Sequence, residues 1–524
     1  MDPLDIARWQ FGITTVYHFL MVPLTIGLGA TVAIMHTAWV RTDNPQYLRM
    51  TKFWGKLYLI NFIVGVATGI VQEFQFGMAW SEYSRFVGDV FGAPLAMEGL
   101  LAFFVESTFL GLWIFGWGRL PKKLHLATLW VAVIGSWLSA YFIIAANSWM
   151  QHPVGVELID GRPVLVDIWA VLGNNTAVAA YTHTIAGSVA VAGGFLLGIA
   201  WYQLWQRRKD GIDTVDATGR VVVGEAPEIP GRDRADHKVW LNSLRLGALV
   251  AIIGFGAVAI SGDLQAKLMY EQQPMKMAAA EGACHTGTSF SILTLGDVGA
   301  TDCSSVTTLI EVPGVLSFLA KGDFVTDMPG ITDLLPYYQE QYGATLADDG
   351  LYGDRAGSEI QYVPLLWVTY WGFRMMIGFG AISAFAAAVA LWLTRKGTVP
   401  RSPWIMRLAV LGILAPFAAN SAGWIFTELG RQPFVVAPNP DPSGIDGVFM
   451  FTAAAVSPGV TAGELLFSTV SLTLVYAVLL AVEVWLLVKY VRGGVASAMP
   501  ELAPHDDPDD PDSGNRSDVL SFAY

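Results

Sequence analysis

Apolar segments long enough to cross a lipid bilayer recur along the whole chain. A bilayer core needs about 20 apolar residues in a helix, and a helix satisfies its backbone hydrogen bonds within itself. Only 14% of the 524 residues are charged, against roughly 25% in soluble domains. The pattern excludes a soluble globular protein and predicts an all-α polytopic membrane protein. About nine transmembrane helices are expected, near residues 12–40, 53–72, 95–117, 124–147, 178–204, 240–261, 363–393, 404–427 and 464–488.

The basic residues between these spans predict the orientation of the chain. The segments after spans 1, 3, 5, 7 and 9 hold 21 of the 31 Lys and Arg residues, and the alternate segments hold eight. Because basic residues are enriched in cytoplasmic loops, we expect the N-terminus outside and the C-terminus in the cytoplasm. The start, MDPLDIARWQFG, has no basic region and no cleavage site, so the first span is expected to be a retained helix.

The spans divide the chain into four expected segments. Much of the net charge of -13 comes from aspartates near the C-terminus, so this charge does not call for a basic partner. No nucleotide fingerprint is present, and no nucleic-acid partner is expected. The segments are 1–261 with six helices, 262–362 as a long outer loop between helices 6 and 7, 363–490 with three helices, and 491–524 as an acidic, disordered cytoplasmic tail.

The outer loop is a candidate site. Loops longer than about 15 residues are usually functional or disordered, and this loop carries the polar, helix-forming stretch EQQPMKMAAAEG. It also holds both cysteines, Cys284 and Cys303. They match no zinc or iron-sulfur ligand set, and a disulfide is predicted if the loop faces an oxidising compartment.

Two carboxylates stand inside the third span. Glu98 and Glu106 interrupt the stretch MEGLLAFFVES, although an ionisable group at the centre of a membrane helix costs about 2.5 to 3.5 kcal/mol. Glu106 is expected about 12 Å deeper than Glu98 at 1.5 Å per residue, and about 80° away around the helix. Two protonated acids that bond to neighbouring helices are one explanation. A proton relay is the prediction we favour.

Several potential haem ligands are expected in the outer half of the bilayer. His18 and His183 lie in spans that enter from outside; alone, each would more often be a satisfied core histidine, although imidazole is a common haem ligand. Span 7 carries Arg374 and Met376 in YWGFRMMIGFG, and methionine can be an axial ligand of haem iron. Span 8 ends in GWIFTELGRQPF, which brings Glu428 and Arg431 to the same level. This layer predicts a cofactor site, with arginines available to pair haem propionates.

Taken together, eight stretches resemble subunit I of the cytochrome bd-type quinol oxidases of bacteria. The resemblance runs from about residue 8 to residue 435, and the order of the stretches agrees. One departure is Phe434, where the family usually has Trp after GRQP; the cysteine pair is another. The stretches are ARWQFGITTVYHFL, EFQFGMAW, FGAPLAMEGLLAFFVESTF, ANSWMQHPVG, HTIAGS, QPMKMAAAE, FRMM and GWIFTELGRQP.

The resemblance implies three haems, namely two haem b and one haem d. It implies that His183 and Met376 are the axial ligands of a low-spin haem b, with Arg374 beside it. His18 and Glu428 each match a ligand of one of two high-spin haems, a haem b and a haem d. Which of the two binds which haem stays open, with His18 favoured for haem d. Trp424 and Arg431, in the same stretch as Glu428, are further cofactor-binding candidates.

The resemblance also implies residues for proton transfer and quinol binding. Glu98 matches a carboxylate beside the dioxygen-reducing centre, and Glu106 with Ser139 and Asn147 matches a proton path. Lys276 and Glu281 match the quinol-binding residues of the outer loop. Without the resemblance, this Lys and Glu would be an exposed salt bridge worth under about 1 kcal/mol.

The implied protein is a quinol:oxygen oxidoreductase of the bacterial cell membrane. Its expected partners are quinol, dioxygen, membrane lipid, a second membrane subunit and a small single-helix subunit. It would take protons from the cytoplasm and build a proton-motive force without a separate pump. A secondary transporter is the alternative from another class, but it predicts inverted repeats and broken helices. A haem-copper oxidase would need more intramembrane histidines, and a purely structural subunit would leave the polar layer unexplained.

Overall fold

The computed structural model describes residues 2–215, 221–223, 236–348, 351–440 and 447–499. In these ranges nine helical spans are long and apolar enough to cross a membrane, which confirms the predicted fold class and number of spans. Of the tail predicted at 491–524, residues 500–524 lie outside the described residues, while α15 continues to Gly493 and η4 (Val495–Ala498) follows, so the start of this segment is helical. The spans are Pro3–Thr42, Pro45–Met78, Ser81–Phe115, Lys122–Gln151, Ile168–Lys209, Asp236–Gln272, Leu366–Leu393, Pro403–Leu429 and Ala462–Gly493.

Six spans are single helices and three are interrupted. The sixth span continues to Gln272, beyond its expected end at residue 261. The helices are α1 (Pro3–Thr42), α2 (Pro45–Met78), α3 (Ser81–Met97), η1 (Glu98–Phe103), α4 (Phe104–Phe115), α5 (Lys122–Gln151), α6 (Ile168–Leu172), α7 (Asn175–Lys209), α8 (Asp236–Gln272), α9 (Pro274–Glu281), α10 (Val315–Lys321), α11 (Ile331–Tyr342), η2 (Gly353–Arg355), α12 (Leu366–Leu393), α13 (Pro403–Leu411), α14 (Leu414–Leu429), η3 (Thr452–Ala454), α15 (Ala462–Gly493) and η4 (Val495–Ala498).

Polar caps set where several spans begin. The carboxylate of Asp2 accepts a hydrogen bond from the Leu4 amide at 3.0 Å, and Pro3 follows as the first residue of α1. Asn44 caps α2 in the same way. At α15, Thr461 and Glu464 form a reciprocal capping box. These side chains satisfy amide groups that the first turn of a helix leaves free.

The third span contains a π-helical turn that the sequence did not predict. η1 begins at Glu98 and separates α3 from α4. The expected angle of 80° between Glu98 and Glu106 assumed α-helical winding throughout. A π turn closes i→i+5 hydrogen bonds and rotates less per residue than an α turn, so it brings the eight steps between these residues closer to two full turns. The two carboxylates therefore lie nearer to one face of the span than expected.

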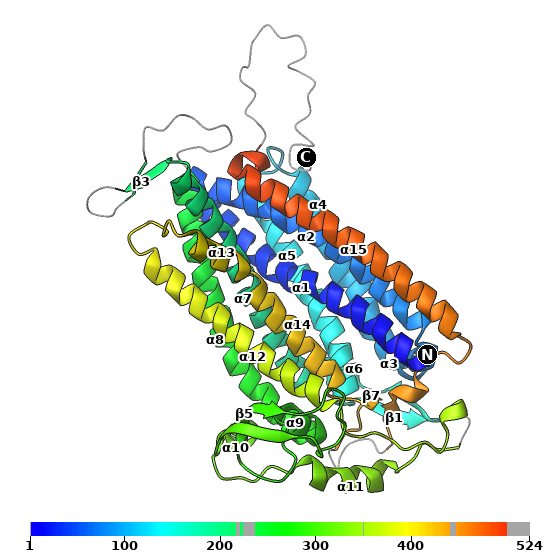
Figure 1. Ribbon diagram of the computed structural model, residues 1–524. Helices are drawn as coiled ribbons and strands as arrows, with labels where there is room; N and C mark the ends of the chain where they lie inside the picture. The colour runs from blue at the N-terminus through cyan, green and yellow to red at the C-terminus, as the bar shows by residue number, and fades with distance from the viewer. Residues whose placement is uncertain (1, 216–220, 224–235, 349–350, 441–446, 500–524) are drawn as a thin grey trace.

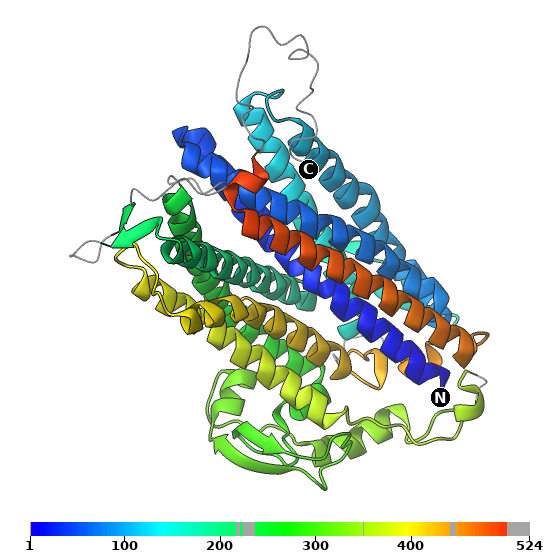
Figure 2. The ribbon, with the colours of Figure 1, turned by 45° about the horizontal axis from the view of Figure 1, so that its top comes forward.

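The bundle packs around close helix pairs. α7 lies along α8, α1 along α2, and α12 along α14 (Figure 1). At the α7–α8 contact a Cβ on Gly193 would lie 2.3 Å from the Ala251 amide nitrogen, so only glycine allows this approach. α15 lies along α1 and α2 (Figure 2).

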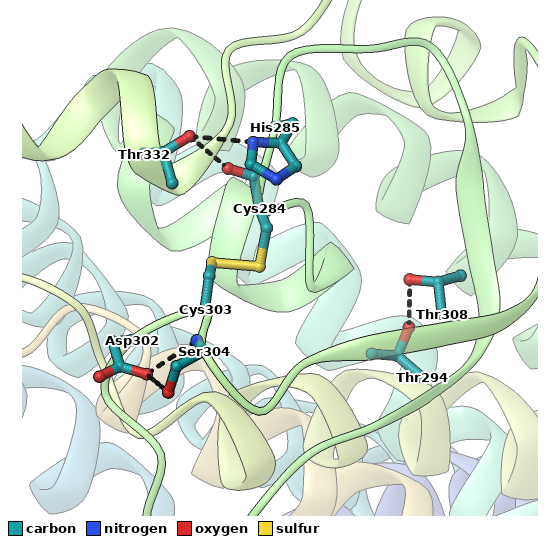
Figure 3. Close-up of a disulfide and its surroundings, with 8 residues drawn as sticks. All are labelled: Cys284, His285, Thr294, Asp302, Cys303, Ser304, Thr308 and Thr332. Atoms are coloured by element: carbon teal, nitrogen blue, oxygen red, sulfur yellow. Dashed lines mark hydrogen bonds between the residues drawn. A yellow bond between two sulfur atoms is a disulfide. The ribbon is translucent and has the colours of Figure 1, made fainter.

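The long connection between α8 and α12 covers the end of the bundle that also carries the N-terminus (Figure 1). It contains α9, α10, α11 and an antiparallel hairpin of β5 and β6. Cys284, after α9, is bonded to Cys303 in the β5–β6 connection, with 5.8 Å between their Cα atoms (Figure 3). The strand pairs are β1 (Val156–Ile159) with β2 (Arg162–Leu165), β3 (Asp213–Val215) with β4 (Val221–Val223), β5 (Phe290–Leu295) with β6 (Thr307–Val312), and β7 (Phe434–Val436) with β8 (Met450–Phe451).

Candidate functional site: histidine, methionine and carboxylate groups around α14

His18 of α1 is held by a hydroxyl of α2. Its Nδ1 lies 3.0 Å from Thr68 Oγ1, and Thr68 is fully buried. The Thr68 hydroxyl donates its proton to the carbonyl of Val64 or Gly65, each at 3.0 Å. Because its one proton is used, the hydroxyl oxygen can only accept from the ring. His18 therefore carries its proton on Nδ1 and has a lone pair on Nε2.

His183 of α7 has the same arrangement with α8. Its Nδ1 lies 3.1 Å from Ser261 Oγ, and that hydroxyl donates to the Ala257 carbonyl at 2.7 Å. The imidazole again carries its proton on Nδ1 and leaves the Nε2 lone pair free. A glycine follows each hydroxyl residue: a Cβ on Gly69 would lie 3.1 Å from the His18 ring, and one on Gly262 would lie 3.3 Å from the His183 ring.

In each case a hydroxyl and a glycine hold the histidine ring, an arrangement that we call a histidine cradle. Both cradles suit an imidazole that binds iron. A metal-binding histidine usually donates its other ring N–H to a protein acceptor, which fixes the tautomer and orients the ring. The structure provides that acceptor for both His18 and His183, with a glycine that lets the ring lie against the neighbouring helix. Among the described residues, none forms a hydrogen bond to Nε2 of either ring. The residues present therefore fit haem.

α14 brings the other candidate ligands together. The ring of Trp424 stacks on Phe19, the neighbour of His18, at 4.9 Å. A Cβ on Gly423 would lie 2.7 Å from the sulfur of Met376, so α12 places this sulfur directly against α14. One turn beyond Trp424, Glu428 is the second-last residue of α14. α1 and α12, which carry His18 and Met376, thus contact α14 close to Glu428.

α7 reaches the same helix. A Cβ on Gly187, one turn from His183, would lie 2.6 Å from Asn420 Oδ1 of α14. The four expected iron ligands therefore lie on four helices that contact one another around α14. Which haem each ligand binds stays a prediction.

Glu428 is the centre of a polar cluster. Asn147 of α5 donates to Glu428 Oε1 at 3.0 Å, and Arg431 donates to Oε2. Each carboxylate oxygen keeps a further lone pair. Within the described ranges, Nε and Nη1 of Arg431 and Nε1 of Trp424 are buried without a hydrogen-bond partner. Unsatisfied buried donors of this kind call for an acceptor, and a haem propionate would provide one.

The two carboxylates of the third span each bind a serine of α5. Ser139 donates to Glu98 Oε1 at 2.9 Å, and Ser136 donates to Glu106 Oε1. The two serines are three residues apart, so they lie about one turn apart on the same face of α5. A Cβ on Gly135 would lie 3.0 Å from the Glu106 backbone, which shows how closely the helices approach. The structure therefore aligns Glu106, Ser136, Ser139 and Glu98 in one row.

Asn147, expected in this proton path, joins a different cluster. It binds Glu428, as described above, and its Oδ1 lies 3.4 Å from Gln151 Nε2. Gln151 Oε1 in turn accepts from Lys276 Nζ at 3.0 Å. A chain of side-chain contacts thus runs from Lys276 in the loop to Glu428 in the bundle.

Lys276 is buried in α9 between the loop and the bundle. Its Nζ lies 5.5 Å from the centroid of the Phe426 ring, and burial lowers the pKa of Lys276 to about 7. A lysine with such a pKa can both hold and release a proton near neutral pH. An exposed surface pair, the alternative for Lys276 and Glu281, is excluded by the burial of both residues.

Glu281, at the end of α9, forms an ion pair with Arg374 of α12. Arg374 Nη2 donates to Glu281 Oε2 at 2.6 Å, and Arg374 Nε donates to the Ser291 carbonyl at 2.8 Å. Burial raises the pKa of Glu281, and the charge of Arg374 opposes this shift. The guanidinium also lies 4.2 Å from the centroid of the Phe290 ring. The Glu281 carboxylate of the loop is therefore bound to Arg374, which precedes Met376 by two residues in α12.

A cavity of about 90 Å³ opens beside Lys276, and Arg431 is also in its lining. Its wall includes tyrosines of α11 and Phe434, the residue that departs from the family pattern. Phe434 stacks on Phe451 at 4.9 Å, and Tyr342 packs edge-on against it at 5.6 Å. An aromatic ring thus fills this position, as the usual Trp would.

Four polar residues of the site escaped the sequence analysis. Thr68 and Ser261 are hydroxyl residues that precede a glycine inside an apolar span, and this Thr-Gly or Ser-Gly pair was the available signal. Ser136 is one turn from the predicted Ser139. Gln151 closes the fifth span, but nothing in the sequence distinguishes it from a helix-end residue.

Comparison with known proteins identifies the family of this chain. The family model for cytochrome bd terminal oxidase subunit I matches residues 6–495. The chain is 40% identical to cytochrome bd ubiquinol oxidase subunit 1 of Bacillus subtilis (strain 168), over 94% of each chain. It is 34% identical to cytochrome bd-II ubiquinol oxidase subunit 1 of Escherichia coli (strain K12), over 95% of this chain and 98% of that one.

A solved structure shares the fold. The bd oxidase from Geobacillus thermodenitrificans superposes with a TM-score of 0.74 and 26% identity, over 94% of this chain and 98% of that one. The residues that the family model matches include the histidine cradles, Lys276 and Glu281. This multi-pass membrane chain therefore belongs to the cytochrome bd terminal oxidase subunit I family.

Proposed function

We propose that this chain is the haem-holding subunit of a terminal quinol oxidase, which oxidises quinol on its outer side and reduces dioxygen to water. The observation that carries the proposal is the pair of histidine cradles, in which a helix hydroxyl fixes the proton on Nδ1 and leaves Nε2 as a ligand. A transporter has no use for two imidazoles prepared in this way. Membership of the terminal oxidase family supports haem as the group they hold.

We assign these residues to two haem b and one haem d as follows. His183 and Met376 would hold a low-spin haem b. His18 and Glu428 would each hold one of two high-spin haems, and we favour haem d for His18. The unpartnered donors of Arg431 would bind a propionate. When bound, the haems supply the redox centres that pass electrons from quinol to dioxygen.

Lys276 and Glu281 would bind the quinol head group. The Lys276 ammonium can donate a hydrogen bond to one quinol oxygen, and the Glu281 carboxylate can accept the proton of a quinol hydroxyl. Glu281 is 1% exposed, so a proton that it accepts must pass to the neighbouring polar groups or to water. Its ion pair with Arg374 holds it beside the helix of Met376.

The row of serines and glutamates between the third span and α5 would conduct protons from the cytoplasm into the helix bundle. Glu106 is 6% exposed and keeps its hydrogen bond to Ser136, so its carboxyl group can take up a proton and pass it toward Ser139 and Glu98. Quinol releases its protons on the outer side. The reaction would therefore build a proton-motive force without a separate pump.

The proposed partners follow from the same family. They are a second membrane subunit, quinol, dioxygen and membrane lipid, with a small single-helix subunit as an addition, in a bacterial cell membrane. The apolar faces of α12, α13 and α15 expose large side chains, including Phe385, Trp404 and Phe467. Such faces suit lipid or another membrane subunit.

The purified membrane complex tests the proposed function directly. We expect a reduced-minus-oxidised optical spectrum with low-spin haem b, high-spin haem b and haem d bands. We also expect oxygen uptake that depends on reduced quinol. A colourless preparation, or one that takes up no oxygen with quinol, would contradict the proposal and leave a transporter as the better explanation.

Substitution of Glu281 by glutamine is expected to lower quinol oxidation by about 100-fold, because an amide cannot accept the quinol proton. The amide oxygen can still accept from Arg374, so the haem spectrum should persist. The measurement is quinol oxidation per haem in membranes. Glu271→Gln is the matched control, since Glu271 pairs with Lys321 on the exposed side of the same region. Unchanged quinol turnover in Glu281→Gln would remove Glu281 from the quinol site.

A further inference from the structure

A third buried carboxylate lies in the last span and has no place in the proposed mechanism. Glu483 of α15 is 3% exposed, whereas its neighbours Val482 and Val484 are 46% and 49% exposed. Placing an ionisable group inside a membrane span costs about 2.5 to 3.5 kcal/mol. Glu483 Oε2 is buried and has no hydrogen-bond partner within the described part of the chain. Such a group calls for a physical explanation.

Two tyrosines lie with Glu483 along the contact of α15 with α1 and α2, which we call the seam. Tyr17 of α1 stacks on Tyr476 of α15, with 4.6 Å between ring centroids, and Tyr476 lies nearly two turns from Glu483 on the same helix. The Tyr17 hydroxyl is also buried without a partner among the described residues. Two unsatisfied polar groups on one buried seam are the setting in which an ordered water bridges side chains.

The seam ends at the His18 cradle. The Tyr476 hydroxyl donates to the Thr68 carbonyl at 3.2 Å, and the Thr68 hydroxyl holds His18 Nδ1. Tyr17 precedes His18 in α1. The tyrosine pair therefore contacts the same threonine that orients one expected iron ligand.

The seam also continues toward the end of the bundle that we propose to be cytoplasmic. Tyr476, Glu483 and Tyr490 are spaced by seven residues, which is nearly two turns and about 10.5 Å per step, so they share one face of α15. The ammonium of Lys56 of α2 lies 4.9 Å from the centroid of the Tyr490 ring, and Lys489 is next to it. Figure 2 shows α15 alongside α1 and α2 over this length. Polar groups therefore follow the seam from the C-terminal end toward His18.

We propose that Glu483 carries protons along the seam of α1, α2 and α15 toward the His18 site, on a route distinct from Glu106. The inference rests on the proposed oxidase function. The Glu483 carboxyl releases a proton to a water between it and Tyr17, and it takes up another from the Lys56 side, so the carboxyl is regenerated. Dioxygen reduction consumes one proton for each electron. The Glu106 row ends at Glu98 and the Glu483 row ends at His18, so each route serves different protons of one turnover.

Glu483→Gln tests this route because the amide keeps the size and polarity of the side chain but cannot carry a proton. The measurement is quinol-dependent oxygen uptake per haem in the full membrane complex, with a haem spectrum of each preparation. We expect turnover to fall by about tenfold or more with haem content unchanged. Glu483→Asp, which keeps a carboxyl, is expected to recover part of the activity. Glu464→Gln is the matched control on the exposed start of the same helix.

Two results would overturn the route. One is wild-type turnover in Glu483→Gln. The other is a loss of turnover that indicates a packing role, either because haem is lost in parallel or because Glu483→Asp does not restore activity. Wild-type complex that takes up no oxygen with quinol would overturn the oxidase function itself and this route with it. An active wild type with an unaffected Glu483→Gln variant overturns the route alone.

Discussion

Substitution of His183 by alanine is expected to abolish the low-spin haem b spectrum and to lower the haem content by one haem. The imidazole would be the nitrogen ligand of the proposed haem, and its Nε2 lone pair is free because the proton lies on Nδ1, against Ser261. The neutral thioether of Met376 alone is a weak ligand for iron. The measurement is a reduced-minus-oxidised spectrum together with total haem per protein. Quinol oxidation should fall with it, because electrons then lose their entry centre.

The control for this prediction is another histidine of the same chain. His285 is exposed on the outer loop and contacts Thr332 at 3.4 Å (Figure 3), so His285→Ala should leave the spectrum unchanged. Retention of the high-spin bands in His183→Ala shows that the bundle has assembled. A low-spin haem that persists in this variant would remove His183 from the ligand set.

Substitution of Glu106 by glutamine is expected to slow oxygen reduction by about 100-fold or more, with all haems retained. The glutamine side chain can still bond to Ser136, so the packing of α4 against α5 is kept. What is lost is a group that can alternate between a protonated and an ionised form at the start of the proposed proton row. The measurement is oxygen uptake with reduced quinol, normalised to haem.

Glu82→Gln provides the matched comparison on the same span. Glu82 pairs with Arg85 at the start of α3, and exposed pairs of this kind contribute under about 1 kcal/mol. This variant should keep wild-type turnover. Normal oxygen uptake in Glu106→Gln would show that protons reach the dioxygen site without the row of Glu106, Ser136, Ser139 and Glu98.

Much of the fold could be predicted from the sequence because the bilayer leaves few alternatives. A span of about 20 apolar residues that must satisfy its own backbone can only be a helix, and the nine spans are confirmed. Their ends were less predictable. α8 continues to Gln272, because polar residues can extend a helix out of the apolar core. No pattern in the sequence predicts the π turn that begins at Glu98.

The chemical groups of the site could be predicted, but their partners could not. Ionisable and ligand residues are conspicuous in an apolar span, so His18, His183, Glu98 and Glu106 could be found singly. Pairing depends on which helices touch and at what height. Ser139 and Asn147 are expected in one path with Glu106, but the sequence does not show that Ser139 bonds to Glu98 and Asn147 to Glu428.

The order of apolar and polar residues along this chain by itself determined a nine-helix membrane protein, and it predicted the long loop between the sixth and seventh spans and a layer of potential haem ligands. Only the tertiary structure decided which ring nitrogen of each histidine is free, because that depends on hydroxyls 50 and 78 residues away in the chain. It also decided that Glu281 pairs with Arg374 and that Tyr476 of the last span bonds to Thr68, which holds His18. The physical reason is that burial in a helical span follows from local composition, whereas hydrogen bonds between helices depend on their rotation and height, which only the packed bundle fixes.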